Sequence, residues 1–432
     1  MIRPHSSPLY GGSSFHDGIS FNAETQRVVI KAVGGSPTVT SLTSAFTFTC
    51  GNQSMYRGAN GLLVQAVTNT PRIEYDAGGS CLGLLMEASR TNLALQSQDL
   101  ATTWTVSGAT ASANSVAAPD GTTTADTLVE SSGGTFHLVR QDVTITANSA
   151  YTFSVFVKAA GRTACKLQVS NTLENTGANA DFDLTAVTAS NVTNFGTGAS
   201  SAATITAYAN GWYRISLRTT IDAASTTGRI QLLLANPAGT TSYSGDGASG
   251  MYMWGMQYEL GQFMSSYIPT TTIAVARTAD SCIRTLSTEY SATAGTVVVQ
   301  GRASGGQDTA QQYVYEFGDG TGNESTRLQR QANTDLCRVN VVDGGVAQSG
   351  ALTDFTFVNS TAFKHSLSWS VNDLAASLNG AAVTTDAVAT IPTTTSLGLG
   401  ISTFGLPANG HIRRFDYYPT RLSNAFLQLA SA

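Results

Sequence analysis

The sequence predicts an all-β chain that is divided into more than one domain. Three observations indicate this fold class: the length, the composition and the alternation of apolar with polar residues. A chain of 432 residues is too long for one compact core and suggests two to four domains. Only 12% of the residues are charged, and Thr, Ser, Ala, Gly and Asn fill their place, as in 35–48 and 186–210. Thr favours pleated strands, whereas Gly and Asn favour the turns between strands.

The first part of the chain, residues 1–95, is predicted to be an irregular segment. It contains loops rich in Gly, Ser and Pro, and its short apolar stretches include residues 27–30. A denser block follows at residues 71–93. Because few long apolar runs precede that block, we expect the segment to need a partner, such as a symmetry mate or a larger assembly, in order to become ordered.

Residues 96–280 are predicted to form a jelly-roll-like antiparallel sandwich. Apolar and polar residues alternate along 151–158, 212–218 and 251–261, and turn signals such as the Pro-Asp-Gly at 119–121 separate the strands. Alternation with a period of two places one face in a core and the other in water. The residues expected on the inward faces are Tyr151, Phe153, Val155 and Val157; Tyr213, Ile215 and Leu217; and Tyr252, Trp254, Met256, Tyr258 and Leu260.

A second antiparallel sandwich is predicted over residues 285–432. Apolar strands at 296–300 and 312–317 open it. The dipeptides Asp-Gly at 343–344 and Asn-Gly at 379–380 each predict a hairpin, because these residues tolerate the positive φ that tight turns require.

The end of this second sandwich is expected to contain three further elements. Residues 363–371 alternate, and a strand at 411–418 is followed by a short helix with Ser423 as its N-cap. The alternation is expected to turn one set of residues to a common face: Phe363, His365, Leu367, Trp369 and Val371.

Charge and cysteine usage exclude several partners and compartments. The net charge of −5 argues against nucleic acid as the main partner, because phosphate binding needs a concentrated positive surface. No stretch approaches the ~18 apolar residues of a membrane helix, so we expect no membrane insertion. The start of the chain shows no apolar secretory signal. Five cysteines without a Cys-x-x-Cys spacing are expected to be buried free thiols in a protein made in a reducing cytoplasm.

Several short motifs occur in order between residues 72 and 280. They are Arg-Ile-Glu-Tyr-Asp at 72–76, Leu-Gly-Leu-Leu-Met-Glu at 82–87, Arg-Thr-Asn-Leu at 90–93, Trp-Thr at 104–105, Pro-Asp-Gly-Thr at 119–122, Ala-Asp at 125–126, Gln-Tyr-Glu-Leu-Gly at 257–261, Ser-Tyr-Ile-Pro-Thr at 266–270 and Arg-Thr-Ala-Asp at 277–280. In this order they resemble the motifs of bacteriophage head-spike and tail-fibre proteins. Residues 285–430 resemble a concanavalin A-like, laminin-G-type sandwich through 365–369, 372–380 and 412–422.

The resemblance implies a structural protein on the surface of a virion, as a head spike or a tail fibre, that is assembled in the host cytoplasm. Residues 1–95 would attach it to other capsid or tail proteins. The two sandwiches, of which the one at 96–280 is of a carbohydrate-binding type, would face outward and contact host surface polysaccharide during adsorption. Fibres of this class also imply a homo-oligomer, with a trimer favoured.

Glycan binding by a sandwich usually depends on aromatic rings that lie flat against sugar rings, with polar side chains around them. The candidate rings are Tyr208, Trp212 and Tyr213 in the first sandwich and Tyr313 and Tyr315 in the second. The competing interpretation is that aromatic residues in alternating strands belong to the core, which we favour for Trp104, Trp254 and Trp369. The core interpretation is less strongly favoured for Tyr208 and Trp212, which lie next to an Asn-Gly turn at 210–211.

No catalytic pattern is found in the sequence, and we expect no enzyme. The histidines share no motif, no Gly-x-Ser-x-Gly occurs, and the acidic residues are scattered rather than paired. No cofactor is expected. Structural calcium is the one metal considered for sandwiches of this type, although turn formation accounts for each available carboxylate. These carboxylates are Asp181, Asp183, Asp246 and Asp373.

The sequence favours the first of three functions and leaves the other two as alternatives. The first is a virion spike or fibre that contacts host glycans, the second is a spike that degrades polysaccharide, and the third is a decoration protein without a ligand.

Overall fold

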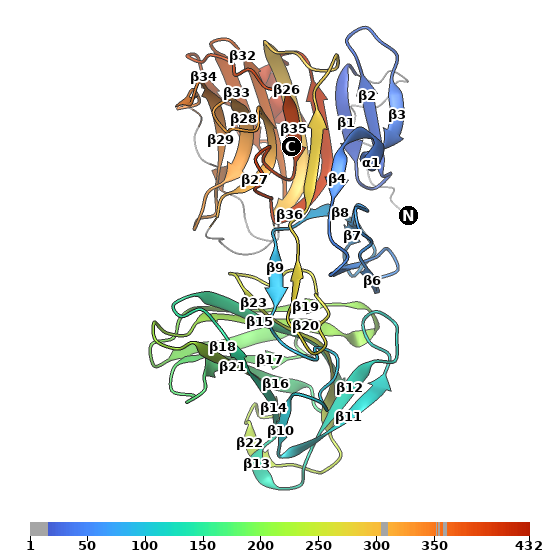
Figure 1. The fold of residues 1–432 in the computed structure, drawn as a ribbon, viewed down its shortest axis with the longest axis vertical. Helices are drawn as coiled ribbons and strands as arrows, with labels where there is room; N and C mark the ends of the chain where they lie inside the picture. The colour runs from blue at the N-terminus through green and yellow to red at the C-terminus, as the bar shows by residue number, and fades with distance from the viewer. Residues whose placement is uncertain (1–15, 304–309, 351, 353–354, 357–360) are drawn as a thin grey trace.

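The computed structural model describes residues 16–303, 310–350, 352, 355–356 and 361–432. Nearly all of their regular structure is antiparallel β-strand, arranged in two lobes that are stacked along the long axis of the molecule (Figure 1). The lobe at the top of Figure 1 contains both the first and the last strands of the chain, and we call it the terminal lobe. The other contains β10 to β23, residues 105–260, and we call it the central lobe. The prediction of an all-β chain with antiparallel sandwiches is confirmed.

The terminal lobe is a sandwich of two large sheets. The first sheet runs in the order β3 (Thr38–Ser41), β2 (Arg27–Lys31), β1 (Gly18–Asn22), β36 (Gly410–Tyr418), β26 (Ala294–Ala303), β32 (Ala362–Ser370), β33 (Asp373–Leu378) and β34 (Thr384–Asp386), and β8 (Cys81–Met86) pairs with both β36 and β7 (Ile73–Tyr75). The second sheet runs in the order β30 (Val346–Ala347), β29 (Leu336–Asp343), β28 (Ser325–Arg330), β27 (Gln312–Gly318), β35 (Ser396–Leu399), β25 (Ser281–Thr285) and β4 (Thr47–Thr49), and β31 (Phe355–Thr356) pairs with β29.

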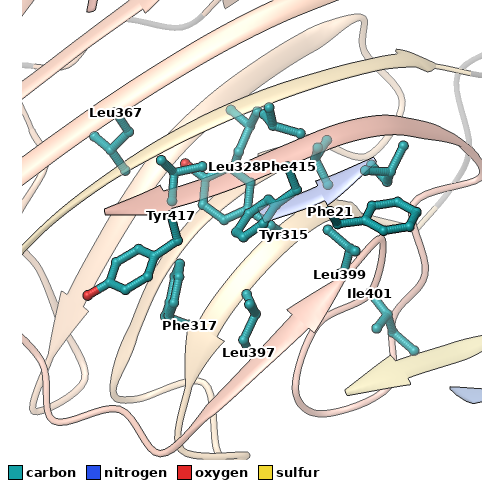
Figure 2. Packing of buried hydrophobic residues seen from close by; sticks show 14 of the residues in the cluster. Phe21, Tyr315, Phe317, Leu328, Leu367, Leu397, Leu399, Ile401, Phe415 and Tyr417 are labelled. Atoms are coloured by element: carbon teal, nitrogen blue, oxygen red, sulfur yellow. The ribbon is translucent and has the colours of Figure 1, made fainter. Parts of the chain in front are cut away.

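The core of the terminal lobe lies between these two sheets. Figure 2 shows rings and aliphatic side chains from both sheets in contact, among them Phe317, Phe415 and Tyr417. The rings of Phe317 and Tyr417 have their centroids 5.0 Å apart. Trp369, on the predicted inward face of β32, is fully buried in the same cluster. Val371, predicted on that face, lies beyond the end of the strand and is 59% exposed.

The N-terminal strands belong to this sandwich, which differs from the separate irregular segment expected for residues 1–95. Strand β1 pairs with β36, so that Ile19 lies opposite Tyr417 and Phe21 lies opposite Phe415, and β4 pairs with β25. Short strands cannot bury their own apolar side chains, and the C-terminal sandwich buries them instead. The first 15 residues of the expected attachment segment lie outside the described residues.

The central lobe is a second sandwich of two six-stranded sheets. The first runs in the order β10 (Thr105–Ser107), β14 (Leu138–Thr144), β21 (Thr227–Ala235), β16 (Ala164–Asn171), β17 (Gly177–Asp183) and β18 (Thr188–Phe195). The second runs in the order β11 (Ala109–Val116), β12 (Ala125–Glu130), β23 (Gly250–Leu260), β15 (Ala150–Ala160), β20 (Tyr213–Thr220) and β19 (Ala199–Ala207). The predicted inward faces of β15 and β20 do face the core between these sheets.

The alternation along β23 is interrupted, and the predicted inward face is correct for only part of the strand. Gly255 adopts φ +65°, and the pairing with β15 shifts there by one residue. Such a bulge places two residues opposite one and reverses the side-chain phase. Met256 and Tyr258 therefore face the core between the sheets, whereas Trp254 packs in a separate cluster with Phe156.

Two short strands connect the lobes. Strand β9 (Arg90–Asn92) enters the central lobe, β24 (Val275–Arg277) returns from it, and the two pair side by side in the space between the lobes (Figure 1). The remaining elements are α1 (Leu42–Ala45), β5 (Met55–Arg57), β6 (Leu63–Gln65), β13 (Gly134–Phe136), η2 (Ala209–Gly211), β22 (Ser242–Ser244) and α2 (Asn424–Ala430). The Ser423 side chain caps α2 as predicted, since it accepts a hydrogen bond from the Phe426 N–H.

Candidate functional site

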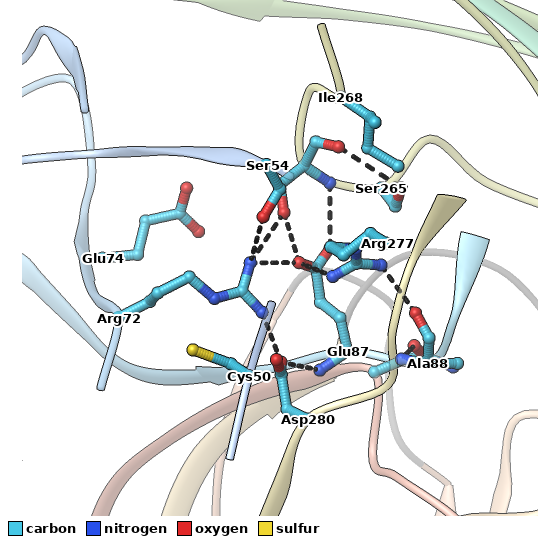
Figure 3. Close-up of polar contacts among 12 residues, drawn as sticks. Cys50, Ser54, Arg72, Glu74, Glu87, Ala88, Ser265, Ile268, Arg277 and Asp280 are labelled. Carbon is cyan, nitrogen blue, oxygen red and sulfur yellow. Dashed lines mark hydrogen bonds and ion pairs between the residues drawn. The ribbon is translucent and has the colours of Figure 1, made fainter. Parts of the chain in front are cut away.

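Four buried charged residues meet where the lobes join (Figure 3). Arg72 precedes β7, Glu87 follows β8, Arg277 ends β24 and Asp280 precedes β25. The Arg72 guanidinium lies 2.7 Å from a Glu87 carboxylate oxygen and also donates to Asp280. Arg277 donates to Glu87, and the Glu87 N–H donates to Asp280 at 2.8 Å. We call these four residues the junction cluster; each is less than 10% exposed.

The charges of the junction cluster compensate one another. Burial raises the pKa of Glu87, but Arg277 and Arg72 outweigh that effect and hold the pKa well below its usual range. Burial lowers the pKa of Arg72, whereas Glu87 and Asp280 raise it, with a net increase. A buried charge without its partner costs several kcal/mol, roughly 3–5. The motif residues at 72, 87, 277 and 280 therefore act in this structure as a clamp between distant segments.

A small cavity of about 120 Å³ lies beside the junction cluster. Its lining includes Glu74, Tyr208 and His411. The His411 Nε2 and the Glu74 Oε2 are 2.6 Å apart. Burial raises the pKa of Glu74. The hydrogen bond and charge of His411 lower the pKa by more than burial raises it, so the net shift is downward. A carboxyl group with a lowered pKa is ionised at neutral pH, so Glu74 suits ion pairing better than proton donation.

A larger hollow of about 280 Å³ lies on the outer side of the first sheet of the terminal lobe. It is lined by His16, Ser20, Asn22, Thr25, Arg27, Val29, Val39 and Arg414, from β1, β2, β3, β36 and the adjoining loops. The strands alternate here as expected: Ile19 and Phe21 face the core, so Ser20 and Asn22 face outward. We call this site the sheet hollow.

The sheet hollow combines hydrogen-bonded polar groups, an exposed arginine and apolar walls. Asp416 accepts a hydrogen bond from the Ser20 hydroxyl at 2.5 Å and forms an ion pair with Arg414, whose Nε lies 2.7 Å from the carboxylate. The His16 ring stacks on Tyr418, with centroids 3.9 Å apart. The exposed Arg27 has no carboxylate within ion-pair distance among the residues that the structure describes. Val29 and Val39 supply apolar walls.

The structure buries three of the five rings that were predicted to bind glycan. Trp212, Tyr313 and Tyr315 are 1%, 2% and 0% exposed. The Trp212 indole N–H donates to the Ala117 carbonyl at 3.1 Å. A ring without exposed surface offers no face to a sugar, so the core interpretation holds for these three and the site prediction is corrected.

The other two predicted rings are partly exposed but already in contact. The Arg57 guanidinium lies 4.4 Å from the centre of the Tyr208 ring, and Phe156 meets that ring edgewise with centroids 4.9 Å apart. Tyr213 packs against the core of the central lobe. Neither residue lines the sheet hollow, and Tyr208 lines the small cavity at the junction.

The four carboxylates considered for calcium have protein partners. Asp183 and Asp246 each accept hydrogen bonds from the backbone of the turn that follows them. Asp181 pairs with Lys166, and Asp373 pairs with Arg421. No group of three or more His, Cys, Asp or Glu able to hold a metal ion occurs in the described ranges. All five cysteines are buried, and no disulfide joins them within the described residues.

The residues of the sheet hollow were not found from the sequence. Their signal is present in 18–31, where Ile19, Phe21 and Val28 alternate with polar residues. If this stretch is interpreted as two strands with Ile19, Phe21 and Val28 inward, Ser20, Asn22 and Arg27 are predicted to share the outer face. The partner strand, which brings Arg414, lies almost 400 residues later in the chain. In the part of the chain that is described, no helix is long and apolar enough to cross a membrane.

No protein-family model and no curated protein sequence matches the chain. Among solved structures, the CBM40 of the Ruminococcus gnavus IT-sialidase bound to α2,3-sialyllactose is 16% identical, with 33% of this chain and 84% of that chain covered and a TM-score of 0.27. Domains LG4-5 of the mouse laminin α1 chain are 8% identical, with 66% and 85% covered and a TM-score of 0.21. The Trypanosoma rangeli sialidase in complex with the inhibitor DANA is 8% identical, with 71% and 60% covered and a TM-score of 0.28. At these TM-scores the likeness assigns no function to this chain.

The comparisons correct one expectation. The sequence indicated a protein without enzymatic activity, yet the similar structures include this sialidase and a mutant of it that displays trans-sialidase activity, which is 10% identical over 94% of this chain. Missing motifs are weak evidence, because the acids and bases of a site can come from distant segments. The expectation of a non-enzyme is therefore not retained.

Proposed function

We propose that this protein is a spike or fibre on the surface of a bacteriophage particle and that it binds host polysaccharide through the sheet hollow. The observation that carries the proposal is the hollow itself. Its volume of about 280 Å³ approaches the ~300–1,000 Å³ of small-molecule sites. Its amide, hydroxyl and guanidinium groups can hydrogen-bond to sugar hydroxyls, and its two valines can contact the apolar face of a sugar ring.

The charge of the hollow favours a sugar that carries an anionic group. Arg414 is already paired with Asp416, whereas Arg27 meets no carboxylate among the described residues. Guanidinium groups bind carboxylates, sulfates and phosphates with two parallel hydrogen bonds. A polysaccharide with such groups would use Arg27 for its charge and Asn22 and Ser20 for its hydroxyls.

The location on a phage particle is supported by the ordered motifs between residues 72 and 280. Several of their side chains form the junction cluster, in which Arg72 and Glu87 also hydrogen-bond to Ser266 in the segment that leaves the central lobe. A fixed arrangement of two sandwiches suits a spike, because an adsorption protein must present its binding surface at a defined distance from the particle.

The test is binding of the full chain to an array of capsular and lipopolysaccharide glycans, with Arg27→Ala as the variant. Loss of one charge-assisted hydrogen-bonding group should weaken binding about 10- to 100-fold. Arg413→Ala is the matched control, because Arg413 is an exposed arginine on β36 that does not line the hollow. Equal binding by wild type and Arg27→Ala would refute the site.

The same incubations distinguish the other two functions. New reducing ends on a bound polysaccharide would assign a degrading activity to the protein. Absence of binding to every glycan, together with attachment to particles, would assign a decoration role.

A further inference from the structure

On one side of the central lobe, two edge strands contain no charged residue. Between Asp183 and Arg214 the sequence contains no Asp, Glu, Lys or Arg. This stretch forms β18 and β19, and most residues of β18 are exposed. Exposed edge strands of soluble monomers usually carry charged side chains, especially lysine, that prevent association. We call the surface of residues 184–207 the edge face.

The edge face is formed by the last strand of each sheet. Strand β18 is outermost in one six-stranded sheet and β19 is outermost in the other, and the two strands contact each other across the side of the sandwich. The pairing of β18 with β17 shifts between the partners of Asn179 and Asp181. Val192 lies at this bulge and is 39% exposed.

The turn beside this edge holds a second exposed valine in an unfavourable backbone conformation. Val187 adopts φ +54° and is 42% exposed. A β-branched residue with positive φ is an outlier, because its branched Cβ crowds the backbone there. Many turns of this chain place Asn at such a position, for example Asn148 and Asn379. An exposed, strained apolar residue is explained if its side chain makes a contact that Asn could not make.

We propose that the edge face is the surface through which copies of this chain associate. The chain has a net charge of −5, so two copies carry the same net charge and repel each other weakly overall. The strands of the edge face bring few like charges together, because Asp181 and Arg218, which reach its border, are already hydrogen-bonded to Asn191 and to the Ser200 carbonyl. The two exposed valines supply the apolar contact that such an interface requires at its centre.

The test is the mass of the full chain in solution, measured by light scattering and sedimentation from micromolar to several hundred micromolar concentration. The chain has a mass of 44.9 kDa; we expect assemblies of two or more copies. Val192→Lys should dissociate them to 44.9 kDa by introducing facing positive charges. A wild-type chain that is monomeric at every concentration, or a variant that remains assembled, would overturn the proposal.

The matched control is Ala113→Lys. Ala113 is an exposed residue of β11, another uncharged edge strand of the same lobe. This variant should remain assembled, and dissociation by Ala113→Lys rather than by Val192→Lys would place the interface at β11 and refute the edge face.

A third variant separates an interface role from a folding role. Val187→Asn relieves the strained φ, so its thermal midpoint should equal or exceed that of the wild type. The same variant removes an apolar contact, so its association should weaken several-fold. A lowered midpoint with unchanged association would show that Val187 serves the fold alone and would count against the proposal.

Discussion

Replacing His365 with leucine should make the folding stability of the terminal lobe less sensitive to acid. His365 lies in β32, is 0% exposed and is surrounded by core residues such as Tyr315 and Phe355, whose ring centroids are 6.5 and 5.5 Å from its own. Neither ring nitrogen has a hydrogen-bond partner among the residues that the structure describes. Burial without a partner disfavours the charged imidazolium and lowers the pKa of His365 to about 3.

The sign and size of the effect follow from proton binding. The ordinary pKa of histidine is 6.5, so between about pH 6.5 and pH 3 the unfolded chain binds a proton that the folded chain does not. Folding stability is therefore fully present above pH 6.5 and falls as the pH decreases through this window. At about 1.4 kcal/mol per pH unit, two units below the ordinary pKa cost about 2.7 kcal/mol at pH 4.5.

The assay is urea unfolding of wild type and His365→Leu at pH 7.5 and at pH 4.5. Other groups also contribute to the pH dependence, so the informative quantity is the difference between the two proteins. The wild type should lose about 2.7 kcal/mol more than the variant between the two pH values. Leu367→Met is the control, because it perturbs the same core without removing a titrating group. Equal losses in wild type and His365→Leu would refute a neutral, unpartnered His365.

Three further predictions test the junction, the corrected site and the N-terminal strands. Glu87→Gln leaves Arg72 and Arg277 underpaired and should cost about 3–5 kcal/mol, seen by calorimetry as earlier melting or as separate transitions of the two lobes; an unchanged trace would contradict the clamp. Trp212→Ala should lower stability by about 3–5 kcal/mol through a cavity while glycan affinity per folded molecule stays constant, and a selective loss of affinity would restore Trp212 as a binding residue. Gly83→Ala places a Cβ 2.7 Å from the Ile412 backbone at φ +136°, so limited proteolysis should cut near β8 faster than in Gly133→Ala, whose Cβ has space; equal cleavage would show that β8 tolerates the change.

Local patterns in the sequence were sufficient for much of the fold. The alternation along β15 and β20 places Phe153 and Leu217 in the core, as expected. Asn379 and Gly380 both adopt positive φ at the predicted turn. These features depend on neighbours within a few residues, so a single sequence contains the information. The same holds for composition, which indicates strands and turns without placing any strand beside another.

Tertiary structure alone decided how the lobes are assembled and where the candidate sites lie. The pairing of Ile19 with Tyr417 and the contact of Arg72 with Asp280 join segments that are separated by hundreds of residues. The bulge at Gly255 reverses which side of β23 is buried, and aromatic rings predicted for glycan binding are enclosed by strands from elsewhere in the chain. Local periodicity shows that a strand has one apolar face. Which distant strand covers that face depends on the free energy of packing the whole chain.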